Sequence, residues 1–183
     1  GKAVETDGFV VNKTFACMLC GIGFDGKIAH EFSKQQTRGL ATYAKLVTRN
    51  FFSASPYHFL IEANGLSFPT EAFFICVANS NQFGNNFTIA PKALLADGLL
   101  DIVIAKRTAK PLLLFNVVKQ IMTGKVRDIK SSIDQPVIYF QTENIKIENI
   151  NEAFMHIDGD PAESPRTIEI EIKKKSFRLI QPV

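Results

Sequence analysis

Hydrophobic and polar residues alternate over much of this chain, and alternation of this kind predicts β-strands. Residues 167–175 (TIEIEIKKK) alternate strictly, which places apolar side chains on one face of a strand and charged side chains on the other. Residues 57–68 alternate as well, around a turn at Asn64-Gly65. Further short strand patterns, rich in apolar, β-branched or aromatic residues, occur at residues 8–24, 70–83, 99–106, 137–150, 153–159 and 176–182.

Two segments have instead the three- and four-residue spacing of apolar side chains that predicts an α-helix. Residues 39–56 show this spacing and stop before Pro56, and residues 110–125 carry Pro111 near their first turn. Residues 27–39 are polar and compatible with a helix. Because strands dominate and no strand-helix-strand rhythm repeats, we expect an α+β, mostly β domain: an antiparallel sandwich or barrel-like structure with two inserted helices.

Composition fits one globular domain over residues 1–183. The chain is 46% hydrophobic and 21% charged, which is ordinary for a globular protein, and its net charge of +3 is too weak to indicate nucleic-acid binding. No apolar run reaches the roughly 18 residues that a membrane-spanning helix needs. Three cysteines, Cys17, Cys20 and Cys76, are an odd number, which favours buried thiols in a reducing, cytoplasmic compartment over a disulfide framework.

Charge is distributed unevenly along the second half of the chain. Residues 106–130 hold seven Lys or Arg and one acid, whereas residues 131–163 hold seven acids and one Lys. The simpler interpretation, which we favour, is two solvated surfaces. The alternative is a basic face for an anionic membrane or phosphate, beside an acidic site.

The stretch GIGFDGK, residues 21–27, contains the G-x-G-x-x-G pattern of a dinucleotide-binding turn. Its context is wrong for that role, because the next acid after Glu31 is Glu62 and no strand pattern lies between them. Asp25, inside the turn, would also repel a pyrophosphate. We therefore interpret the stretch as a tight turn whose Asp25 carboxylate is placed to accept hydrogen bonds from a ligand.

Two other turns carry acids. Asp97-Gly98 separates two apolar stretches, and is either a plain turn or part of a site for a hard cation such as Mg²⁺. Asp158 and Asp160 flank Gly159 directly after a strand, and form either a solvated hairpin tip or a pair of carboxylates able to recruit a metal or act as a general base. The Asn-rich loop at residues 79–87 has the composition of loops that line sites.

Taken in order, these pieces resemble one family. GIGFDG, GLATY, ICVANSNQFGNNFTIAPKALLADGLLDIVI, HIDGDPAE and FRLIQP are similar to the second half of diacylglycerol kinase-like lipid kinases, which include bacterial lipid kinases and, more distantly, sphingosine and ceramide kinases. The resemblance covers essentially the whole chain, and APKALLADGLLDIVI is its most specific part. It implies the β-rich, sandwich-like C-terminal domain of the NAD kinase/diacylglycerol kinase-like fold. Members of that family transfer the γ-phosphoryl group of ATP to a lipid hydroxyl, using Mg²⁺.

The resemblance also implies a metal site. Asp97 matches the metal-binding acid of the family, and Leu94 and Leu99 match positions that offer backbone carbonyls. Asp7 matches an acid before the first strand of the motif and is a candidate member of the same metal network.

The catalytic and substrate-binding residues follow from the other motifs. Asp160 matches the carboxylate proton acceptor, Asp158 the first acid of the same motif, and Asp25 an acid that meets the lipid head group in sphingosine-type members. Two departures stand out: the family has a glutamate where this chain has Asp160, and its glycine-rich loop reads FGNN at residues 83–86.

The family's glycine-glycine-aspartate-glycine nucleotide motif is absent, and in the family it belongs to an N-terminal ATP-binding domain. We therefore expect the substrate- and metal-binding half of a lipid kinase, inactive alone, with ATP as co-substrate bound mainly elsewhere. We expect it to be cytoplasmic, to meet its lipid at a membrane surface, and to form a homodimer as one possibility. The alternatives are a non-catalytic lipid-binding or interaction module of the same fold, and an NAD kinase relative. An apolar cleft near Phe51 and Phe52 would favour a lipid ligand over NAD.

Overall fold

A computed structural model describes residues 1–37, 39–81, 89–123, 125–127 and 129–181. Strands predominate in this part of the chain, as the alternating patterns predict. The strands are β1 (Lys2–Val11), β2 (Thr14–Ala16), β3 (Leu19–Gly23), β4 (Tyr57–Ala63), β5 (Leu66–Ala78), β6 (Leu100–Lys106), β7 (Val137–Thr142), β8 (Asn144–Asn149), β9 (Met155–Ile157), β10 (Asp160–Ala162) and β11 (Thr167–Gln181). The helices are α1 (Phe24–Ser33), α2 (Leu40–Phe51), α3 (Lys110–Thr123) and α4 (Ile129–Ser132).

All of these strands belong to one sheet, which branches at β5. The main path runs in the order β10-β9-β3-β5-β4-β8-β11-β1-β2, while β6 pairs with β5 and with β7. Every pairing is antiparallel, so the expectation of an antiparallel α+β domain is confirmed. The branch follows from the length of β5: its first half pairs with β4 and its second half with β3 and β6.

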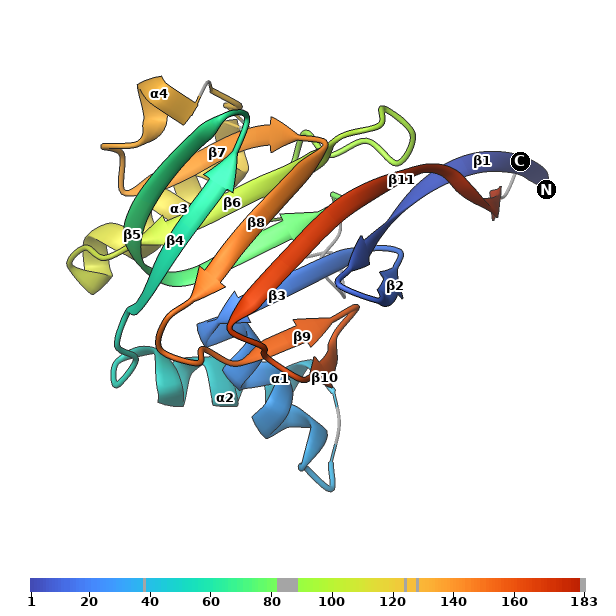
Figure 1. The fold of residues 1–183 in the computed structure, drawn as a ribbon. Coiled ribbons are helices and arrows are strands. Elements are labelled where there is room, and N and C mark those ends of the chain that lie inside the picture. Colours follow the sequence, from blue (N-terminus) through green and yellow to red (C-terminus); the bar gives the residue numbers. More distant parts are fainter. Residues whose placement is uncertain (38, 82–88, 124, 128, 182–183) are drawn as a thin grey trace.

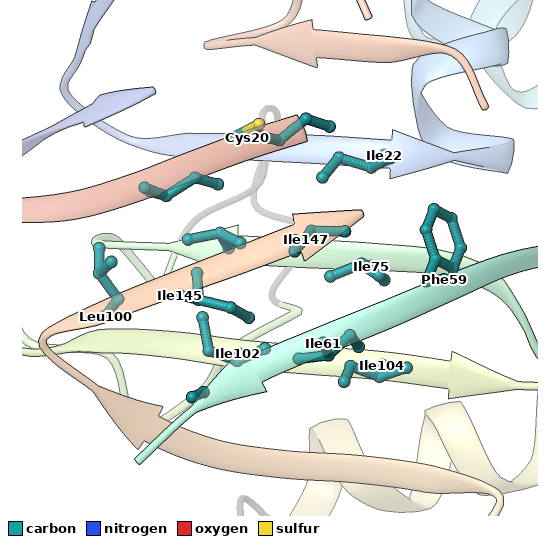
Figure 2. Packing of buried hydrophobic residues seen from close by; sticks show 14 of the residues in the cluster. Cys20, Ile22, Phe59, Ile61, Ile75, Leu100, Ile102, Ile104, Ile145 and Ile147 are labelled. Atoms are coloured by element: carbon teal, nitrogen blue, oxygen red, sulfur yellow. The ribbon is translucent and has the colours of Figure 1, made fainter. Parts of the chain in front are cut away.

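The sheet curls over a single main core, which makes the domain sandwich-like. Side chains of β4 and β8 lie in front of those of β5 and β6, and the apolar residues of these strands meet between them (Figure 2). Ile61 and Ile147 on one side and Ile75 and Ile102 on the other are all fully buried. Burial of so many β-branched side chains is the main favourable term in the stability of this domain.

The helices lie outside the sheet. α1 and α2 pack against each other, and α1 also contacts β3, β9 and β10 (Figure 1). α3 lies against β6 and β7, to which it is anchored by buried Leu113. The sequence predicted two inserted helices; the structure shows these as α2 and α3 and adds α1, in the segment that was only helix-compatible, and the single turn α4. No helix in the described ranges is both long and apolar enough to cross a bilayer.

Candidate functional site

Four polar turns meet at one end of the sheet because of strand register. Leu19 at the start of β3 pairs with Ala78 at the end of β5, and Ala78 also pairs with Asp101 near the start of β6. The turn before β3, the loop after β5 and the turn before β6 therefore lie together. The β9–β10 turn joins them, because Asp158 N donates to Leu19 O at 2.8 Å.

Asp7 fixes the Asp97-Gly98 turn to the sheet. Its carboxylate is buried and accepts from Gly98 N at 2.8 Å through Oδ2 and from Lys175 N at 2.6 Å through Oδ1. Its own backbone N–H donates to Leu95 O at 2.7 Å. Because this buried carboxylate accepts two backbone N–H bonds from distant segments, Asp7 is a structural anchor beside the predicted metal turn.

Asn79 connects Asp7 to the turn before β3. This fully buried side chain donates through Nδ2 to Asp7 O at 2.6 Å and to Cys17 O at 3.2 Å. Its Oδ1 has no hydrogen-bond partner among the described residues. The FGNN stretch, residues 83–86, follows in the same loop and lies outside the described residues, so the prediction for it stays open.

Asp158 holds the turn before β3 in place. Its carboxylate accepts three backbone N–H bonds, from Cys17 at 2.8 Å, Met18 at 2.8 Å and Leu19 at 2.9 Å. Both oxygens are occupied in this way, which is the geometry of an anchoring carboxylate. Asp160 is exposed, as Asp158 is, and lies at the start of β10, where its backbone pairs with Ile157. The two predicted catalytic acids differ in their hydrogen bonds: within the described residues, no hydrogen bond ties down the Asp160 carboxylate.

Asp25 is paired with a histidine that the sequence analysis did not single out. His156 Nε2 and Asp25 Oδ2 are 2.9 Å apart, and His156 is 1% exposed. Gly159 N donates to His156 Nδ1 at 3.2 Å, so Nδ1 is the acceptor and Nε2 carries the proton that it donates to Asp25. The backbone of the β9–β10 turn thus orients the ring, and the ring orients Asp25.

Gly21, the first glycine of GIGFDGK, makes room for this pair. It lies opposite His156 in the β3–β9 ladder, and a Cβ at Gly21 would come within 2.1 Å of Asp25 Oδ2 and 2.3 Å of His156 Nε2. No nucleotide is needed to explain this glycine.

Two buried side chains near Asp25, those of Tyr43 and Cys20, have raised pKa values. Burial, and then the negative charge of Asp25, raise the pKa of the Tyr43 hydroxyl on α2. Burial, followed by the charges of Asp25 and Asp158, raises the pKa of the Cys20 thiol. Cys20 is thus a buried, protonated thiol, and Cys76 is buried as well, as the sequence predicted; Cys17, which was also predicted to be buried, is only partly so.

The predicted metal ligands lie on the turn that Asp7 anchors. Asp97 is exposed, and its Oδ1 accepts from Leu99 N at 3.0 Å; the Leu94 side chain is also exposed. Carboxylate and backbone carbonyl oxygens are suitable for a hard cation such as Mg²⁺. Within the described ranges, however, no three His, Cys, Asp or Glu side chains converge as a metal cluster. A cation here would depend on backbone carbonyls and water as well as on Asp97.

A second buried carboxylate, Asp101, was also missed. Tyr139 Oη donates to Asp101 Oδ1 at 2.7 Å, and Gln141 Nε2 donates to Oδ2 at 3.3 Å. Burial raises the pKa of Asp101, the two hydrogen bonds oppose that shift, and the charge of nearby Asp97 adds to it. In the sequence Asp101 is a single polar residue in a short apolar strand. Its local pattern does not indicate that Tyr139 and Gln141 bind it.

Two hollows in the described part of the chain lie away from Asp25. One, of about 790 Å³, is open and lies over the β4–β5 turn and β11. The other, of about 150 Å³, lies beside α3. Neither hollow is lined by Phe51 or Phe52, so the prediction of an apolar cleft near these residues stays a prediction.

Comparison with known proteins agrees with this architecture. Residues 19–180 match the family model of the YegS C-terminal NAD kinase beta sandwich-like domain. No curated protein matches the chain. Among solved structures, a diacylglycerol kinase from Bacillus anthracis is similar, with a TM-score of 0.64 and 19% identity over 97% of this chain and 53% of that one.

Two structures of a proposed diacylglycerol kinase from the same organism are similar as well. One has a TM-score of 0.71 at 17% identity and the other 0.70 at 20%; each alignment covers 97% of this chain, and 56% and 57% of theirs. At such identities the similarity shows the fold. The chain spans a little over half the length of these relatives.

Proposed function

The chain belongs to the family of YegS C-terminal NAD kinase beta sandwich-like domains, and on that premise we propose that it is the acceptor- and metal-binding half of an ATP-dependent lipid kinase. The acceptor would be the hydroxyl of a diacylglycerol-like lipid. ATP would be bound mainly by a further domain, because the described residues offer candidate carboxylates but no glycine-rich phosphate cradle.

One observation carries this proposal: hydrogen bonds join the predicted metal turn to the predicted catalytic hairpin. They run from Gly98 through Asp7 and Asn79 to Cys17, and from Cys17 to Asp158. A kinase site needs its metal-binding and proton-accepting groups held in fixed relation, because much of its rate comes from positioning. This network supplies such a link through backbone groups, the buried side chains of Asp7 and Asn79, and the Asp158 carboxylate.

In the proposed mechanism each acid has a different task. Asp160, which is exposed, would accept the proton of the lipid hydroxyl as that oxygen attacks the γ-phosphorus of ATP and the bond from this phosphorus to the ADP oxygen breaks, releasing ADP. Asp25, held by His156, accepts a hydrogen bond from the head group and orients it. A hard divalent cation held by Asp97 and the Leu94 and Leu99 carbonyls would neutralise charge on the transferred phosphoryl group.

The test is lipid phosphorylation by a protein that joins this chain to its ATP-binding domain, in mixed micelles with diacylglycerol and radiolabelled ATP. We expect Asp160→Asn to lower kcat by about a hundredfold or more, and Asp160→Glu to retain or raise it. We expect the 183-residue chain alone to be inactive. Unchanged kcat in Asp160→Asn would refute the assigned role.

A non-catalytic lipid-binding module is the second candidate, and specific observations favour it. The Asp158 carboxylate already accepts three backbone N–H bonds, and Asp160 is one methylene shorter than the glutamate of the family. If this candidate holds, Asp160→Asn and Asp160→Glu leave lipid binding unchanged and neither form phosphorylates lipid. For an NAD kinase relative, NAD rather than diacylglycerol would be the phosphorylated acceptor in the same assay.

A further inference from the structure

Strand β11 carries a β-bulge where it passes the predicted metal turn. Its pairing with β1 shifts register on either side of Asp7, so that this one residue faces residues 174–176 of β11. Lys175, in the middle of the bulge, has a φ of 51°, a left-handed conformation that is unfavourable for a non-glycine residue. Bulges change the direction in which neighbouring side chains point. The bulge in β11 therefore sets the directions of the side chains beside Asp7.

Lys174, in this bulge, lies across the Asp97-Gly98 turn. A Cβ added at Gly98 would come within 2.7 Å of Lys174 Cε and 3.2 Å of Lys174 Nζ, so the lysine side chain covers this glycine directly. Gly98 is buried, and its N–H donates to Asp7 Oδ2 at 2.8 Å. The Lys174 ammonium therefore lies beside the residue that separates Asp97 from Leu99.

Glu143 holds the Lys174 ammonium in this place. Lys174 Nζ donates to Glu143 Oε1 at 2.7 Å in an ion pair whose side chains are 54% and 58% exposed. Glu143 follows β7, one residue beyond the pairing of Thr142 with Leu100, and so lies at the same end of the sheet as the Asp97-Gly98 turn. An ion pair as exposed as this one adds little to stability. Its two charges nevertheless act on whatever binds at the turn.

We propose that Lys174 lowers the affinity of the predicted metal turn for a divalent cation. The inference rests on the proposed function, which assigns that cation to Asp97 and to the Leu94 and Leu99 carbonyls. An ammonium beside the turn repels a divalent cation, and it also neutralises the Glu143 carboxylate, which would otherwise attract the cation. Occupancy of the site then follows the cation concentration instead of being permanent.

A purely structural role for the ion pair predicts a different result. If Lys174 only packed on Gly98 and fixed the shape of the turn, removing its ammonium would loosen the turn and weaken cation binding. If the charge of Lys174 opposes the cation, removing the ammonium strengthens cation binding, because the repulsion is lost and the Glu143 carboxylate is freed. The sign of the change in affinity therefore separates the two roles.

The experiment is titration of the 183-residue chain with Mn²⁺, with free Mn²⁺ measured by electron paramagnetic resonance. Lys174→Met keeps a long side chain over Gly98 but removes the charge, and it should tighten Mn²⁺ binding about fivefold. Glu143→Gln removes the opposite charge and should weaken binding. The double variant restores a neutral pair and should bind within about twofold of the wild type. The effects of both single variants should shrink in about 0.5 M NaCl, because salt screens exposed charges.

A second ion pair on β11 provides matched controls. Lys173 Nζ donates to Glu171 Oε2 at 2.8 Å, and these side chains are 42% and 63% exposed. Both residues line the open hollow over the β4–β5 turn, whereas Lys174 and Glu143 do not. Lys173→Met and Glu171→Gln change the net charge of the chain as the test variants do, and should leave Mn²⁺ affinity within about twofold of the wild type. Equal effects at both pairs would overturn the proposal, since they would show a response to net charge alone.

Asp97→Ala separates a failure of this inference from a failure of the proposed function. If Asp97→Ala loses Mn²⁺ binding while Lys174→Met binds no more tightly than the wild type, the cation site stands and the role of Lys174 is overturned. If Asp97→Ala binds Mn²⁺ as the wild type does, or if neither the wild type nor Lys174→Met binds it, the proposed metal site fails and this inference fails with it. Tighter binding in Lys174→Met that Asp97→Ala abolishes would support both.

Discussion

Asp25 and His156, 131 positions apart in the chain, lie with Oδ2 and Nε2 2.9 Å from each other at the junction of β3, β9 and α1. The ring is held on its other side by Gly159 N, so the pair has one defined tautomer and one orientation. Among the described residues, no hydrogen bond to the second oxygen, Asp25 Oδ1, accompanies the bond from His156. This geometry supports the proposal that Asp25 meets a lipid hydroxyl.

Gly21→Ala should destabilise the domain by about 1–3 kcal/mol, because the new methyl group would overlap both Asp25 Oδ2 and His156 Nε2. Urea unfolding followed by circular dichroism measures this. The same substitution in an Asp25→Ala background is the control. In that background Gly21→Ala should lower the free energy of unfolding by less, since Asp25 Oδ2, the closest overlapping atom, is gone. An equal loss of stability in both backgrounds would contradict overlap with Asp25 as the cause.

Asp158→Ala should lower the free energy of unfolding by about 1–2 kcal/mol, because three backbone N–H groups lose a charged acceptor. Asp158→Asn should cost less, since Asn retains an acceptor and tolerates the positive φ of 49° at this position. Asp160→Ala is the control, and its exposed side chain should contribute less than about 0.5 kcal/mol. Equal stability losses at both positions would refute the anchoring role of Asp158.

Asp7→Ala should cost about 2–4 kcal/mol, because Gly98 N and Lys175 N lose their acceptor in a buried setting. Asp97 is exposed and directly precedes Gly98, and Asp97→Ala should leave stability within about 0.5 kcal/mol of the wild type. Titration with Mn²⁺ as a probe should show the reverse order, with Asp97→Ala losing the larger share of affinity. A stability loss in Asp97→Ala as large as in Asp7→Ala would contradict this division of roles.

The Asp101→Asn variant should gain stability relative to the wild type as pH rises, measured as the free energy of unfolding. The folded-state pKa of Asp101 is raised from 3.8, chiefly by burial, so the native state holds its proton to higher pH than the unfolded state. Wild-type stability therefore falls as pH rises from about 4 until Asp101 is ionised in the native state. Asn cannot ionise and lacks this loss.

The measurement for Asp101 is the difference in unfolding free energy between the two proteins at a series of pH values. Tyr139→Phe is the companion variant. It removes a hydrogen bond that lowers the Asp101 pKa, so it should extend the loss to higher pH. A difference that does not change with pH would show that Asp101 titrates alike in both states.

Much of the fold could be predicted from the sequence, because strand formation depends on local pattern. The alternation in residues 167–175 appears in the structure as part of β11, with Ile168, Ile170 and Ile172 buried and the intervening residues facing outward. The tight turn predicted at GIGFDGK is wrong in form: β3 ends at Gly23, whose φ is 99°, and α1 begins at Phe24, so Asp25 lies in the first turn of the helix. The family's motif order identified the fold even though identity to the solved structures is 17–20%.

The sequence by itself thus determined the strand content, the acidic turns and the lack of context for a dinucleotide. Only the tertiary structure decided the tasks that these acids can have. In the folded chain Asp7 and Asp101 are buried, and the Asp158 carboxylate accepts backbone N–H bonds. Asp160 is exposed. These outcomes depend on which backbone atoms and side chains the sheet register brings together from distant positions. Local pattern carries no information on such contacts, which is why His156, the partner of Asp25, was found only in the folded chain.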